Sequence, residues 1–496
     1  MPATRCPCPY AGHLFYCNFK YLIIYVIQFL LNDTNIQTDL PAGSLLLDFA
    51  RYHLHLSGTK IGCREGDCGA CTMLAGEIIG DELVYRSVTS CLVPLGNARG
   101  KHIVTIEGLN TSDLNFIQQS FAEEGAAQCG FCTPGFIVSL AGYCLTETNT
   151  RNQSLLDAID GNICRCTGYK SIERAVTKIA GKLDGNRGAD PIDTAVKQIG
   201  LPGYFKTIKI RLRGCNNQTN GAGQPTPATT RFLGGGTDLY VQHPETMEDA
   251  DINFLLGNAA IKGITQQGNR CALGAAVTVT DMLESPIFQS SFPSLNKYMK
   301  LIASTQIRNL STVAGNMINA SPIGDLTVFF LALDARVILS DGNNRRMVPL
   351  QKFYKGYKII DKDPEEIIEQ ISFDLPGENT LFNFEKVSKR TNLDIASVNS
   401  AICLVMEGDI IRDAALSAGG VAPVPAFLEQ ASTFLRGKAV SPVLIAHLLD
   451  IVQGEISPIS DTRGTVTYKR ILLAQLIKAH FLAFFPEMKA NELIHL

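Results

Sequence analysis

The sequence predicts a multidomain α+β protein, because different parts of the chain carry different apolar patterns. Short strand patterns dominate the first part, apart from one helical stretch near Ser44–His53. From Ser112 to about Leu183, apolar residues recur at helical spacing instead. In the second half, Gly-rich turns separate short strands up to about residue 375, and a mixed region ends in a helix at Lys469–Phe485. At roughly 150 residues per domain, the 496 residues suggest about three domains.

The apolar run Tyr21–Leu31 is the first element along the chain, and it has two interpretations. Its eleven residues are too few to span a bilayer, which takes about 20, but they are compatible with the apolar part of a signal peptide. Asn32 and Asp33 form a turn signal directly after it, and no small-residue cleavage site follows. We therefore expect a strand that enters a hairpin, with no membrane-bound segment. Residues 1–20 match no pattern and are an unassigned extension.

Four helices are expected in the second part of the chain, at Leu114–Phe121, Phe136–Leu145, Ser154–Asp160 and Ser171–Gly181. An amphipathic piece at Tyr204–Arg213 then precedes a stretch rich in Asn, Gly, Gln and Pro at 216–228, which is typical of a linker. The expected division is an extension (1–20), a small α+β domain (21–108), a helical domain (109–187), a linker (188–228), an α+β domain (229–376) and a C-terminal α+β domain (377–496).

The composition excludes several classes of protein. Lys and Arg number 44 against 47 Asp and Glu, so the formal net charge of -3 provides no basic field for nucleic acid. With 18% charged and 46% hydrophobic residues, the chain is expected to fold rather than remain disordered. The fifteen cysteines are too few for a disulfide scaffold, so their spacing carries more information than their number.

The first group of cysteines is Cys63-x4-Cys68-x2-Cys71, with Cys91 after nineteen intervening residues. This is the plant-type ferredoxin spacing for a 2Fe-2S cluster. Gly62, Gly66 and Gly69 leave room for backbone N–H groups to approach the sulfurs, as such a cluster requires. A zinc site or unligated core cysteines are the alternatives, but zinc loops favour pairs of cysteines over three within nine residues.

The second group is Cys129-x2-Cys132 followed, after thirty-one residues, by Cys164-x-Cys166. A C-x2-C pair alone is compatible with a zinc ribbon or a thioredoxin-like redox pair, but the C-x-C partner fits neither. Two loops flanked by helices would bring both pairs together around a second cluster. Unpaired thiolates of this kind suit a reducing cytoplasm, where we expect the protein to reside.

Two further segments have the composition of nucleotide-binding loops. The residues 233–239 read L-G-G-G-T-D-L, which suits a loop whose amides cradle a phosphate, although a Gly-rich hairpin turn is an equally good interpretation. The segment 308–326 is dense in Asn, Ser, Gly and Asp, which suits ribityl and pyrophosphate groups. A polar surface loop is the alternative for this second segment.

At these residues the sequence resembles a known family, the molybdenum hydroxylases. The string 58–72, G-T-K-I-G-C-R-E-G-D-C-G-A-C-T, is similar to the family's ferredoxin signature. The strings 128–135 and 162–169, Q-C-G-F-C-T-P-G and N-I-C-R-C-T-G-Y, are similar to its second-cluster signature. The two polar segments resemble its FAD-binding domain. The resemblance implies a plant-type ferredoxin β-grasp domain, an all-helical 2Fe-2S domain, an α+β FAD-binding domain and an α+β C-terminal flavoprotein domain, in this order.

The resemblance also implies the roles of individual residues. The first cluster would bind Cys63, Cys68, Cys71 and Cys91, and the second Cys129, Cys132, Cys164 and Cys166. Gln128 would hydrogen-bond the pterin of a molybdenum cofactor held by a partner. The residues implied to bind FAD are Gly234, Gly235, Gly236, Thr237, Asp238, Thr312, Gly315, Asn316, Asn319, Ser321, Asp325 and Lys386. No catalytic residue beyond these redox cofactor sites is expected on the chain.

The implied function is electron transfer within an oxidoreductase. Electrons would pass from a molybdopterin centre on a large partner subunit through the second and then the first cluster to FAD and NAD+. Both clusters and a flavin on one chain resemble the small subunit of bacterial xanthine dehydrogenases, which implies purine oxidation and a dimer of heterodimers. The alternatives are an aldehyde or other N-heterocycle dehydrogenase, a self-contained flavin-iron-sulfur reductase, and a zinc-binding interaction protein.

Overall fold

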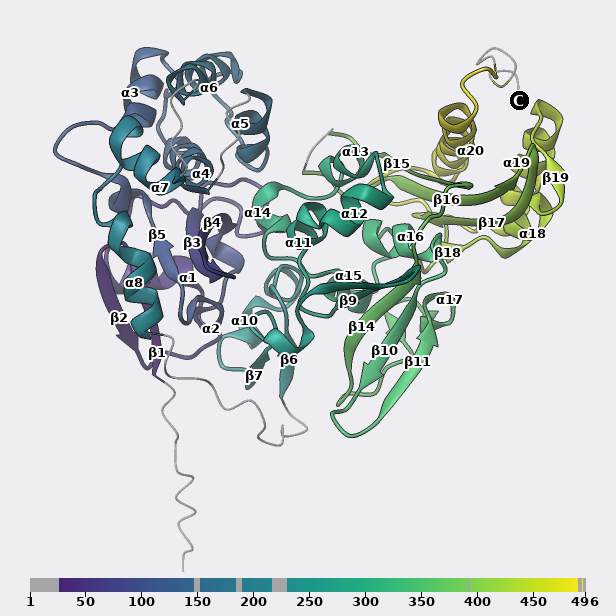
Figure 1. Cartoon of the computed structure of the whole chain (residues 1–496), viewed down its shortest axis with the longest axis horizontal. Coiled ribbons are helices and arrows are strands. Elements are labelled where there is room, and N and C mark those ends of the chain that lie inside the picture. The colour runs from purple at the N-terminus through teal and green to yellow at the C-terminus, as the bar shows by residue number, and fades with distance from the viewer. Residues whose placement is uncertain are drawn as a thin grey trace, which may run out of the picture.

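The computed structural model describes residues 26–146, 152–183, 190–215, 230–390, 393–488 and 493. The expected extension at 1–20, the first residues of the Tyr21–Leu31 run and the expected linker stretch at 216–228 lie outside these ranges. Figure 1 shows an N-terminal lobe on one side, the module built around the central sheet next to it, and the C-terminal strands and helices at the far end. The chain thus has the predicted multidomain α+β architecture.

The first module is a five-stranded sheet in the order β2-β1-β5-β3-β4. Its strands are β1 (Ile27–Leu31), β2 (Thr34–Thr38), β3 (Thr72–Ile79), β4 (Glu82–Thr89) and β5 (His102–Val104). The β1–β2 pair confirms the expected hairpin, and Asn32 adopts the left-handed conformation at its turn, with φ 52°. Its helical elements are α1 (Leu46–Asp48), a π-helical turn (Phe49–His53), α2 (Leu95–Ala98) and 3₁₀ turns at Ser90–Leu92 and Ile106–Leu109.

All four helices expected in the second module are present. They are α3 (Phe116–Glu123), α4 (Thr133–Thr146), α5 (Asn152–Ala158) and α6 (Lys170–Leu183). Helix α4 lies at the centre, because residues on all of its faces are buried, among them Phe136, Leu140 and Cys144. It packs on β3 and β4, so the helical module and the first sheet share one hydrophobic core.

The structure differs from the sequence expectation in the first part of the range expected as a linker. Three helical elements lie there: α7 (Pro191–Thr194), a π-helical turn (Ala195–Ile199) and α8 (Phe205–Cys215). Phe205, Ile208 and Leu212 recur at helical spacing on α8 and are buried in the same core as α4. The described part of this range is therefore packed structure, and only its amphipathic piece was recognisable in the sequence.

The third module surrounds a five-stranded sheet in the order β11-β10-β14-β9-β8. Its strands are β8 (Ile264–Gln267), β9 (Arg270–Gly274), β10 (Arg336–Ser340), β11 (Arg345–Pro349) and β14 (Ile367–Asp374), with the parallel pair β6 (Arg231–Leu233) and β7 (Ile252–Phe254) and the hairpin β12 (Tyr354–Gly356) and β13 (Ile359–Ile360). Its short helices are α9 (Leu239–Gln242), α10 (Pro244–Met247), α11 (Val279–Glu284), α12 (Pro286–Ser291), α13 (Leu295–Lys300), α14 (Thr305–Arg308), α15 (Val313–Ile318), α16 (Asp325–Leu331) and α17 (Leu350–Phe353), with a 3₁₀ turn at Ala259–Ile261.

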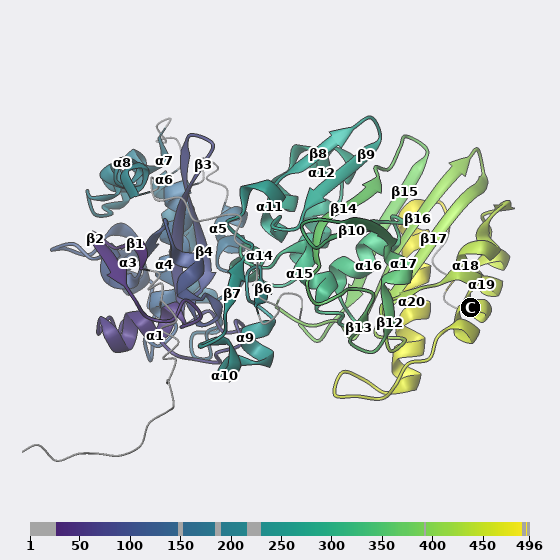
Figure 2. The same ribbon diagram turned by 90° about the horizontal axis from the view of Figure 1, so that it is seen from below.

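The C-terminal module is an antiparallel sheet covered by helices, as Figure 2 shows. Its strands are β15 (Thr380–Val387), β16 (Val398–Glu407), β17 (Ile410–Gly419), β18 (Ala426–Phe427) and β19 (Lys438–Ala439). The helices are α18 (Glu429–Leu435), α19 (Pro442–Glu455) and α20 (Val466–Phe484), and α20 confirms the apolar helix expected near the end of the chain. In the described part of the chain, no helix is both long and apolar enough to cross a membrane.

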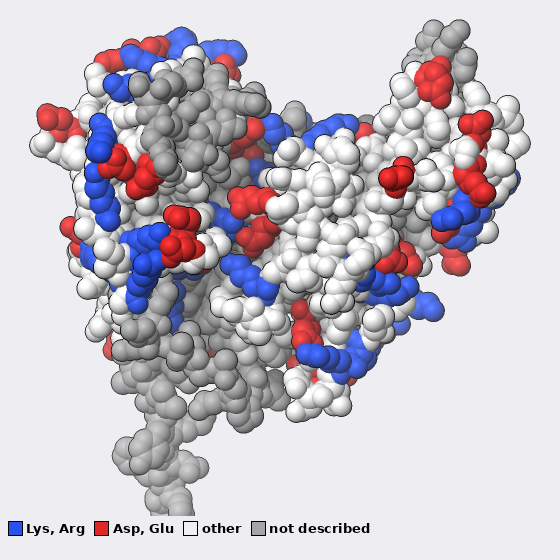
Figure 3. Space-filling view, in the orientation of Figure 1, with Lys and Arg blue, Asp and Glu red and all other residues white. Residues whose placement is uncertain are grey.

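Charged side chains are mixed in sign on the face of the molecule shown in Figure 3. Lys and Arg alternate with Asp and Glu over the N-terminal lobe, and a wide area without charge covers part of the third module. This distribution agrees with the small net charge of -3.

The packing of α8 generates a prediction about stability. Phe205 is fully buried and stacks on Tyr204, with ring centroids 4.5 Å apart. Phe205→Ala should therefore reduce the stability of the N-terminal lobe by about 3 to 5 kcal/mol. Urea unfolding followed by far-UV circular dichroism should show an earlier transition. Ile210→Ala is the matched control, because Ile210 lies on the same helix but is 73% exposed. Equal losses in both variants would contradict the packed position of α8.

Candidate functional site

The first four cysteines converge at one end of the first sheet. Cys63, Cys68 and Cys71 lie on the loop that precedes β3, and Cys91 lies in the 3₁₀ turn that follows β4. The register of β3 and β4 places the two ends next to each other, and the amide of Ser90 donates to the carbonyl oxygen of Cys71 at 3.3 Å. The sheet therefore brings together thiols that are far apart in the sequence.

The loop stabilises the thiolate form of one of these cysteines. The hydrogen bond from the Cys68 thiol, aided by backbone amides, lowers the pKa of Cys63 to about 5. The amides of Glu65 and Cys68 lie 3.3 and 3.4 Å from the Cys63 sulfur. A Cβ at Gly62 would lie only 2.5 Å from the Cys68 sulfur, so glycine is required at this position. The same Cys63–Cys68 hydrogen bond raises the pKa of Cys68, so the pair shares one thiolate at Cys63, and the thiolate is the form that binds iron.

The second four cysteines lie on two loops of the helical module. Cys129 and Cys132 precede α4, and Cys164 and Cys166 lie between α5 and α6. The sulfurs of Cys129 and Cys166 are 3.7 Å apart. The Thr167 hydroxyl donates to the Cys164 sulfur at 3.1 Å. Burial raises the pKa of Cys164, but hydrogen bonds from Thr167, Cys166 and Cys132 together lower it overall.

In both groups the thiols are arranged in pairs. The contacts join Cys63 with Cys68 and Cys71 with Cys91 in the first group, and Cys129 with Cys166 and Cys132 with Cys164 in the second. Among the described residues, no three His, Cys, Asp or Glu side chains converge on a point where a single metal ion would bind. A zinc site needs four ligands around one ion, whereas a 2Fe-2S cluster has two irons that each take two protein ligands. The paired thiols fit the two-iron cluster.

The surroundings of the second group are open to solvent. Cys129 and Cys166 are exposed, in contrast to Cys71 and Cys91, which are each 2% exposed. Gln128, next to Cys129, is also exposed. Two aromatic rings beside these cysteines, Phe131 and Tyr169, are 46% and 40% exposed. The second group therefore has two exposed members and one buried member, Cys164, whereas the first group has one exposed member, Cys63, and two buried members.

The loops that carry the two groups are in direct contact. The amide of Ile163 donates to the carbonyl oxygen of Cys68 at 3.0 Å. The side-chain amide of Asn162 donates to the carbonyl oxygen of Gly69 at 3.0 Å and to the Thr72 hydroxyl at 3.2 Å. A Cβ at Gly69 would collide with the backbone of the second loop, so only glycine permits this approach.

Helix α14 of the third module packs against the same junction. The side chain of Gln306 donates to Asn162 Oδ1 at 3.0 Å and to the Ser139 hydroxyl at 3.1 Å. Arg308 forms an ion pair of 2.6 Å with Asp160, and both side chains are less than 8% exposed. Arg308 also donates to backbone carbonyl oxygens of its own module, so the buried charge is fully hydrogen-bonded. All three modules therefore meet beside the cysteine loops.

The Gly-rich loop of the third module follows β6 and lies against the second polar segment. Gly236 has φ 84°, a conformation that favours glycine. A Cβ at Gly235 would collide with the carbonyl oxygen of Leu310, and one at Gly234 would lie 3.0 Å from the Thr312 hydroxyl. The structure thus brings together the two segments that sequence analysis selected separately, and their small residues leave the close approach that a phosphate-cradling loop needs.

A hydrogen bond links the ends of these two segments. Asn319 Nδ2 donates to Asp238 Oδ1 at 2.7 Å, and Gln242 Nε2 donates to Asn319 Oδ1 at 3.0 Å. Burial raises the pKa of Asp238. The Thr312 hydroxyl accepts from the Gly315 amide at 3.0 Å and begins α15. Asp238, Thr312, Gly315 and Asn319 therefore lie in one polar region.

Lys386 and Asp325 form a second polar centre. Lys386 Nζ lies 2.7 Å from Asp325 Oδ2 and 2.6 Å from the carbonyl oxygen of Leu301. Asn399 Nδ2 donates to Asp325 Oδ1 at 2.5 Å, but Asn399 Oδ1 is buried without a donor. A bound group with an N–H donor would satisfy this oxygen, and the isoalloxazine ring of FAD carries one. This orphaned acceptor and the glycine loop both fit FAD.

The remaining residues implied by the resemblance have mixed surroundings. Asn316 Oδ1 accepts from the Thr327 amide and hydroxyl at 3.2 Å each, so it holds α15 against α16. The Ser321 hydroxyl accepts from the Ile323 amide at 3.4 Å within a turn. Thr237 is partly buried in the Gly-rich loop. All three lie within or beside the two polar segments.

Sequence reasoning missed four residues that the structure places at these sites. Asn162 was quoted only as part of a cysteine signature, and Gln306 and Asn399 belong to no motif. Lys358 donates to the carbonyl oxygen and Oδ1 of Asn319 at 2.5 and 2.8 Å from a hairpin far along the chain. The position of Asn162, two residues before Cys164, was a usable signal for this residue. The others depend on tertiary contacts that spacing does not reveal.

The junction predicts a strong effect of Asn162→Ala. Asn162 is 5% exposed, and the substitution removes four hydrogen bonds while leaving the amide of Gln306 and the carbonyl oxygen of Gly69 buried with fewer partners. We expect a loss of about 2 to 4 kcal/mol in the free energy of unfolding. Urea denaturation measures this loss. Asn343→Ala is the matched control, since Asn343 is exposed and its side chain makes none of these contacts.

Family models match four stretches of the chain. They are the 2Fe-2S iron-sulfur cluster binding domain at 29–95, the [2Fe-2S] binding domain at 105–177, the FAD binding domain in molybdopterin dehydrogenase at 224–376 and the CO dehydrogenase flavoprotein C-terminal domain at 384–484. All four cysteines of the first group lie within the match at 29–95, and all four of the second group lie within the match at 105–177. Both polar segments lie within the FAD-binding match.

Curated relatives and solved structures extend the comparison. Xanthine dehydrogenase of Emericella nidulans is 27% identical over 83% of this chain and 35% of its own length. Aldehyde oxidase 1 of Bos taurus is 25% identical over 96% of this chain and 40% of its own length. A chain of carbon monoxide dehydrogenase from Hydrogenophaga pseudoflava is 26% identical over 52% of this chain and 89% of its own, with a TM-score of 0.48.

The chain spans 35% and 40% of the length of the two curated relatives, so it corresponds to part of those proteins. The match to both kinds of iron-sulfur domain, to the FAD-binding domain and to the flavoprotein C-terminal domain, in the order implied by the sequence, confirms the resemblance. This chain belongs to the molybdenum hydroxylase family and carries its two iron-sulfur domains and its flavin-binding domains.

Proposed function

We propose that this chain is the electron-transfer subunit of a molybdenum hydroxylase of the xanthine dehydrogenase type, delivering electrons from a molybdenum centre on a partner to NAD+. One observation carries the proposal. The two cysteine loops contact each other through the Ile163–Cys68 hydrogen bond, and helix α14 of the flavin module packs against the same place. Short bonded contacts between cofactor-binding loops are what electron transfer among fixed carriers requires.

The chain would hold three redox groups at the sites described above. When bound, each 2Fe-2S cluster supplies one-electron transfer, and FAD supplies the two-electron chemistry that NAD+ needs. The first cluster would be held by the cysteines at 63, 68, 71 and 91 and the second by those at 129, 132, 164 and 166. FAD would be held by residues 234–238, by 312, 315, 316, 319, 321 and 325, and by Lys386. The modules would have the boundaries expected from the sequence, with α7 and α8 added to the helical domain.

The residues around these sites would hold the carriers in a fixed arrangement. Asn162 and Gln306 keep the loops in place. The side chain of Asn162 donates to Gly69 of the first cysteine loop and accepts from the side chain of Gln306. The Arg308–Asp160 pair fixes the orientation of the flavin module, since either charge left alone in this buried place would be costly. Gly66 packs against Ile307 of α14, and a Cβ at this position would collide with the Ile307 side chain.

The exposed rim of the second group would be the entry point for electrons. Gln128, Phe131 and Tyr169 surround Cys129 and Cys166 with exposed amide and aromatic surface. Such a rim suits a partner that covers it, because aromatic side chains supply much of the binding energy at interfaces. We propose a large molybdopterin-binding subunit as this partner, with Gln128 facing its pterin, in a dimer of heterodimers.

The proposed substrate is a purine such as xanthine or hypoxanthine. Relatives with the name xanthine dehydrogenase support it, whereas the bovine aldehyde oxidase keeps an aldehyde as the alternative. Fusion of the iron-sulfur and flavin domains on one chain also favours the xanthine dehydrogenase type. The substrate itself would bind to the partner, at the molybdenum centre.

Metal analysis tests the iron-sulfur sites. The purified chain should contain about four irons and four labile sulfides, because each of two clusters has two of each. Cys166→Ser should remove about half of the iron and the electron paramagnetic resonance signal of one reduced cluster. Cys403→Ser is the control, because Cys403 lies on β16 away from both cysteine groups and should leave both signals intact. Zinc without sulfide would contradict the proposal.

Co-purification tests the partner and the substrate. The chain, expressed with the reading frames beside its gene, should bring down a chain that contains molybdopterin, and the complex should reduce NAD+ with xanthine. Gln128→Ala should lower the rate at least tenfold while leaving the iron, sulfide and flavin contents unchanged, since Gln128 is exposed and supports no described contact. A complex that oxidises aldehydes but not xanthine would replace the purine with the alternative substrate. A chain that reduces acceptors with no molybdopterin partner would contradict the subunit role.

A further inference from the structure

A lysine outside every sequence motif bonds to Asn319, which is itself bonded to the Gly-rich loop of the flavin module. Lys358 lies at the tip of the β12–β13 hairpin, with φ 58°. Its Nζ is 2.5 Å from the carbonyl oxygen of Asn319 and 2.8 Å from Asn319 Oδ1. Asn319 in turn donates to Asp238, the last residue of the loop 234–238. A single residue, Asn319, therefore bridges the ammonium group and the loop proposed to hold a phosphate.

The charge of Lys358 lacks a close counter-ion. Among the ion pairs formed by the described residues, none includes Lys358. Asp238 acts on it only at longer range, and partial burial lowers the pKa of Lys358. Burial raises the pKa of Asp238, while the nearby charge of Lys358 acts in the opposite direction. A cation that is partly desolvated and bonded only to neutral oxygens is arranged to receive an anion.

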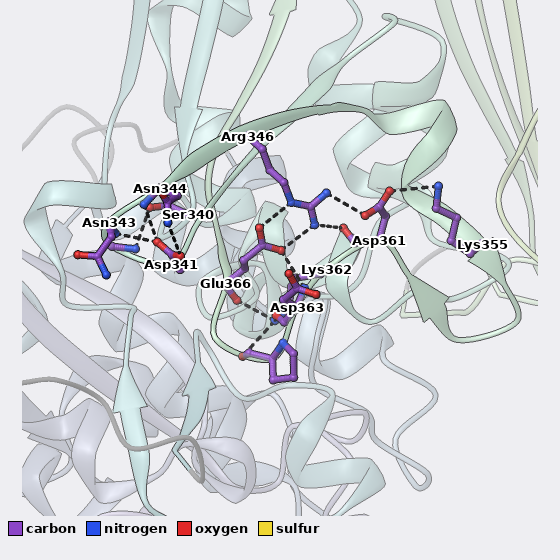
Figure 4. A network of polar contacts seen from close by, with 12 residues as sticks. Ser340, Asp341, Asn343, Asn344, Arg346, Lys355, Asp361, Lys362, Asp363 and Glu366 are labelled. Carbon is purple, nitrogen blue, oxygen red and sulfur yellow. Dashed lines mark hydrogen bonds and ion pairs between the residues drawn. The ribbon is translucent and has the colours of Figure 1, made fainter.

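The hairpin that carries Lys358 is fixed at both ends. At its start, the Tyr354 hydroxyl donates to the carbonyl oxygen of Met317 at 3.1 Å and thus anchors β12 to α15. At its end, Asp361 binds Arg346, which also binds Glu366, at 2.8 and 2.7 Å, as Figure 4 shows. The lysine is held in place before any ligand arrives, which reduces the entropy lost when an anion binds.

We infer that Lys358 binds the pyrophosphate of a dinucleotide held by the loop 234–238, and that this dinucleotide is FAD. The inference rests on the proposed flavin site and adds a cation to it. The loop, Asn319 and Lys358 all lie within the match to the FAD-binding domain at 224–376. An ammonium group pairs well with phosphate as a point charge, and amides of a glycine-rich loop supply the remaining donors. The same chemistry would serve the pyrophosphate of NAD+, so the test separates the two dinucleotides.

The test measures flavin affinity in the full-length chain. Flavin is removed from the wild-type protein and from Lys358→Met, and FAD is added back while quenching of its fluorescence is recorded. Lys358→Met should raise the Kd for FAD at least tenfold. The Kd for riboflavin, which has no phosphate, should change less than twofold. Lys358→Gln, which keeps a hydrogen-bond donor but not the charge, should behave like Lys358→Met, and Lys358→Arg should retain most of the affinity.

The controls separate this inference from the proposed function. Lys352→Met removes a charge from α17, close to the hairpin; Lys352 is exposed like Lys358 but has no described bond to Asn319, so its loss should leave the Kd for FAD unchanged. Wild-type protein that binds neither FAD nor riboflavin would contradict the flavin site itself. Wild-type affinity for FAD in Lys358→Met, or in Lys358→Gln, would overturn the role of the charge while leaving the flavin site intact. Unchanged FAD affinity with a raised Kd for NAD+ would overturn FAD as the dinucleotide.

Discussion

The side-chain amide of Asn162 is the contact on which the relation between the modules depends. It donates to the first cysteine loop at Gly69 and Thr72, and it accepts from Ser139 of α4 and from Gln306 of the flavin module. A planar amide offers two donors and two acceptor positions, and here all are used. Because every bond has a directional requirement, the three modules are held in one register rather than merely in contact.

The ion pair next to this amide adds orientation more than stability. Arg308 and Asp160 are both almost completely buried, and removing two charges from water costs about as much as their attraction returns. The gain lies in specificity, because a displaced flavin module would leave one of the charges unpaired. Gly69 and Gly161 complete the junction, since their missing side chains allow the loop backbones to approach. Polar residues and glycines thus line the junction, while apolar clusters pack within the modules and also connect the first sheet to the helical module and to the flavin module.

Local patterns in the sequence predicted the features that arise locally. The cysteine spacings, the hairpin at Asn32 and the helix α4 all depend on residues close together in the chain, and all are present. The packed helix α8 was expected within a linker, because its amphipathic pattern does not tell whether Phe205 has a core to bury against. Lys358 and Asn399 were missed for a related reason. Their partners lie 39 and 74 residues away, and no spacing rule predicts a contact made by folding.

The unequal burial of the two cysteine groups has a consequence for chemical durability. Sulfurs that face solvent are reached by dissolved oxygen and peroxide, whereas the buried Cys71 and Cys91 lie in an apolar cluster with Leu92 and Tyr240. A subunit without its partner would therefore be oxidised first at its exposed thiols, which are Cys129 and Cys166 in the second group and Cys63 in the first. Assembly with a partner would then protect the exposed thiols from oxidation as well as connect the redox centres. The earlier the partner binds, the larger the fraction of chains that would keep these thiols reduced in air.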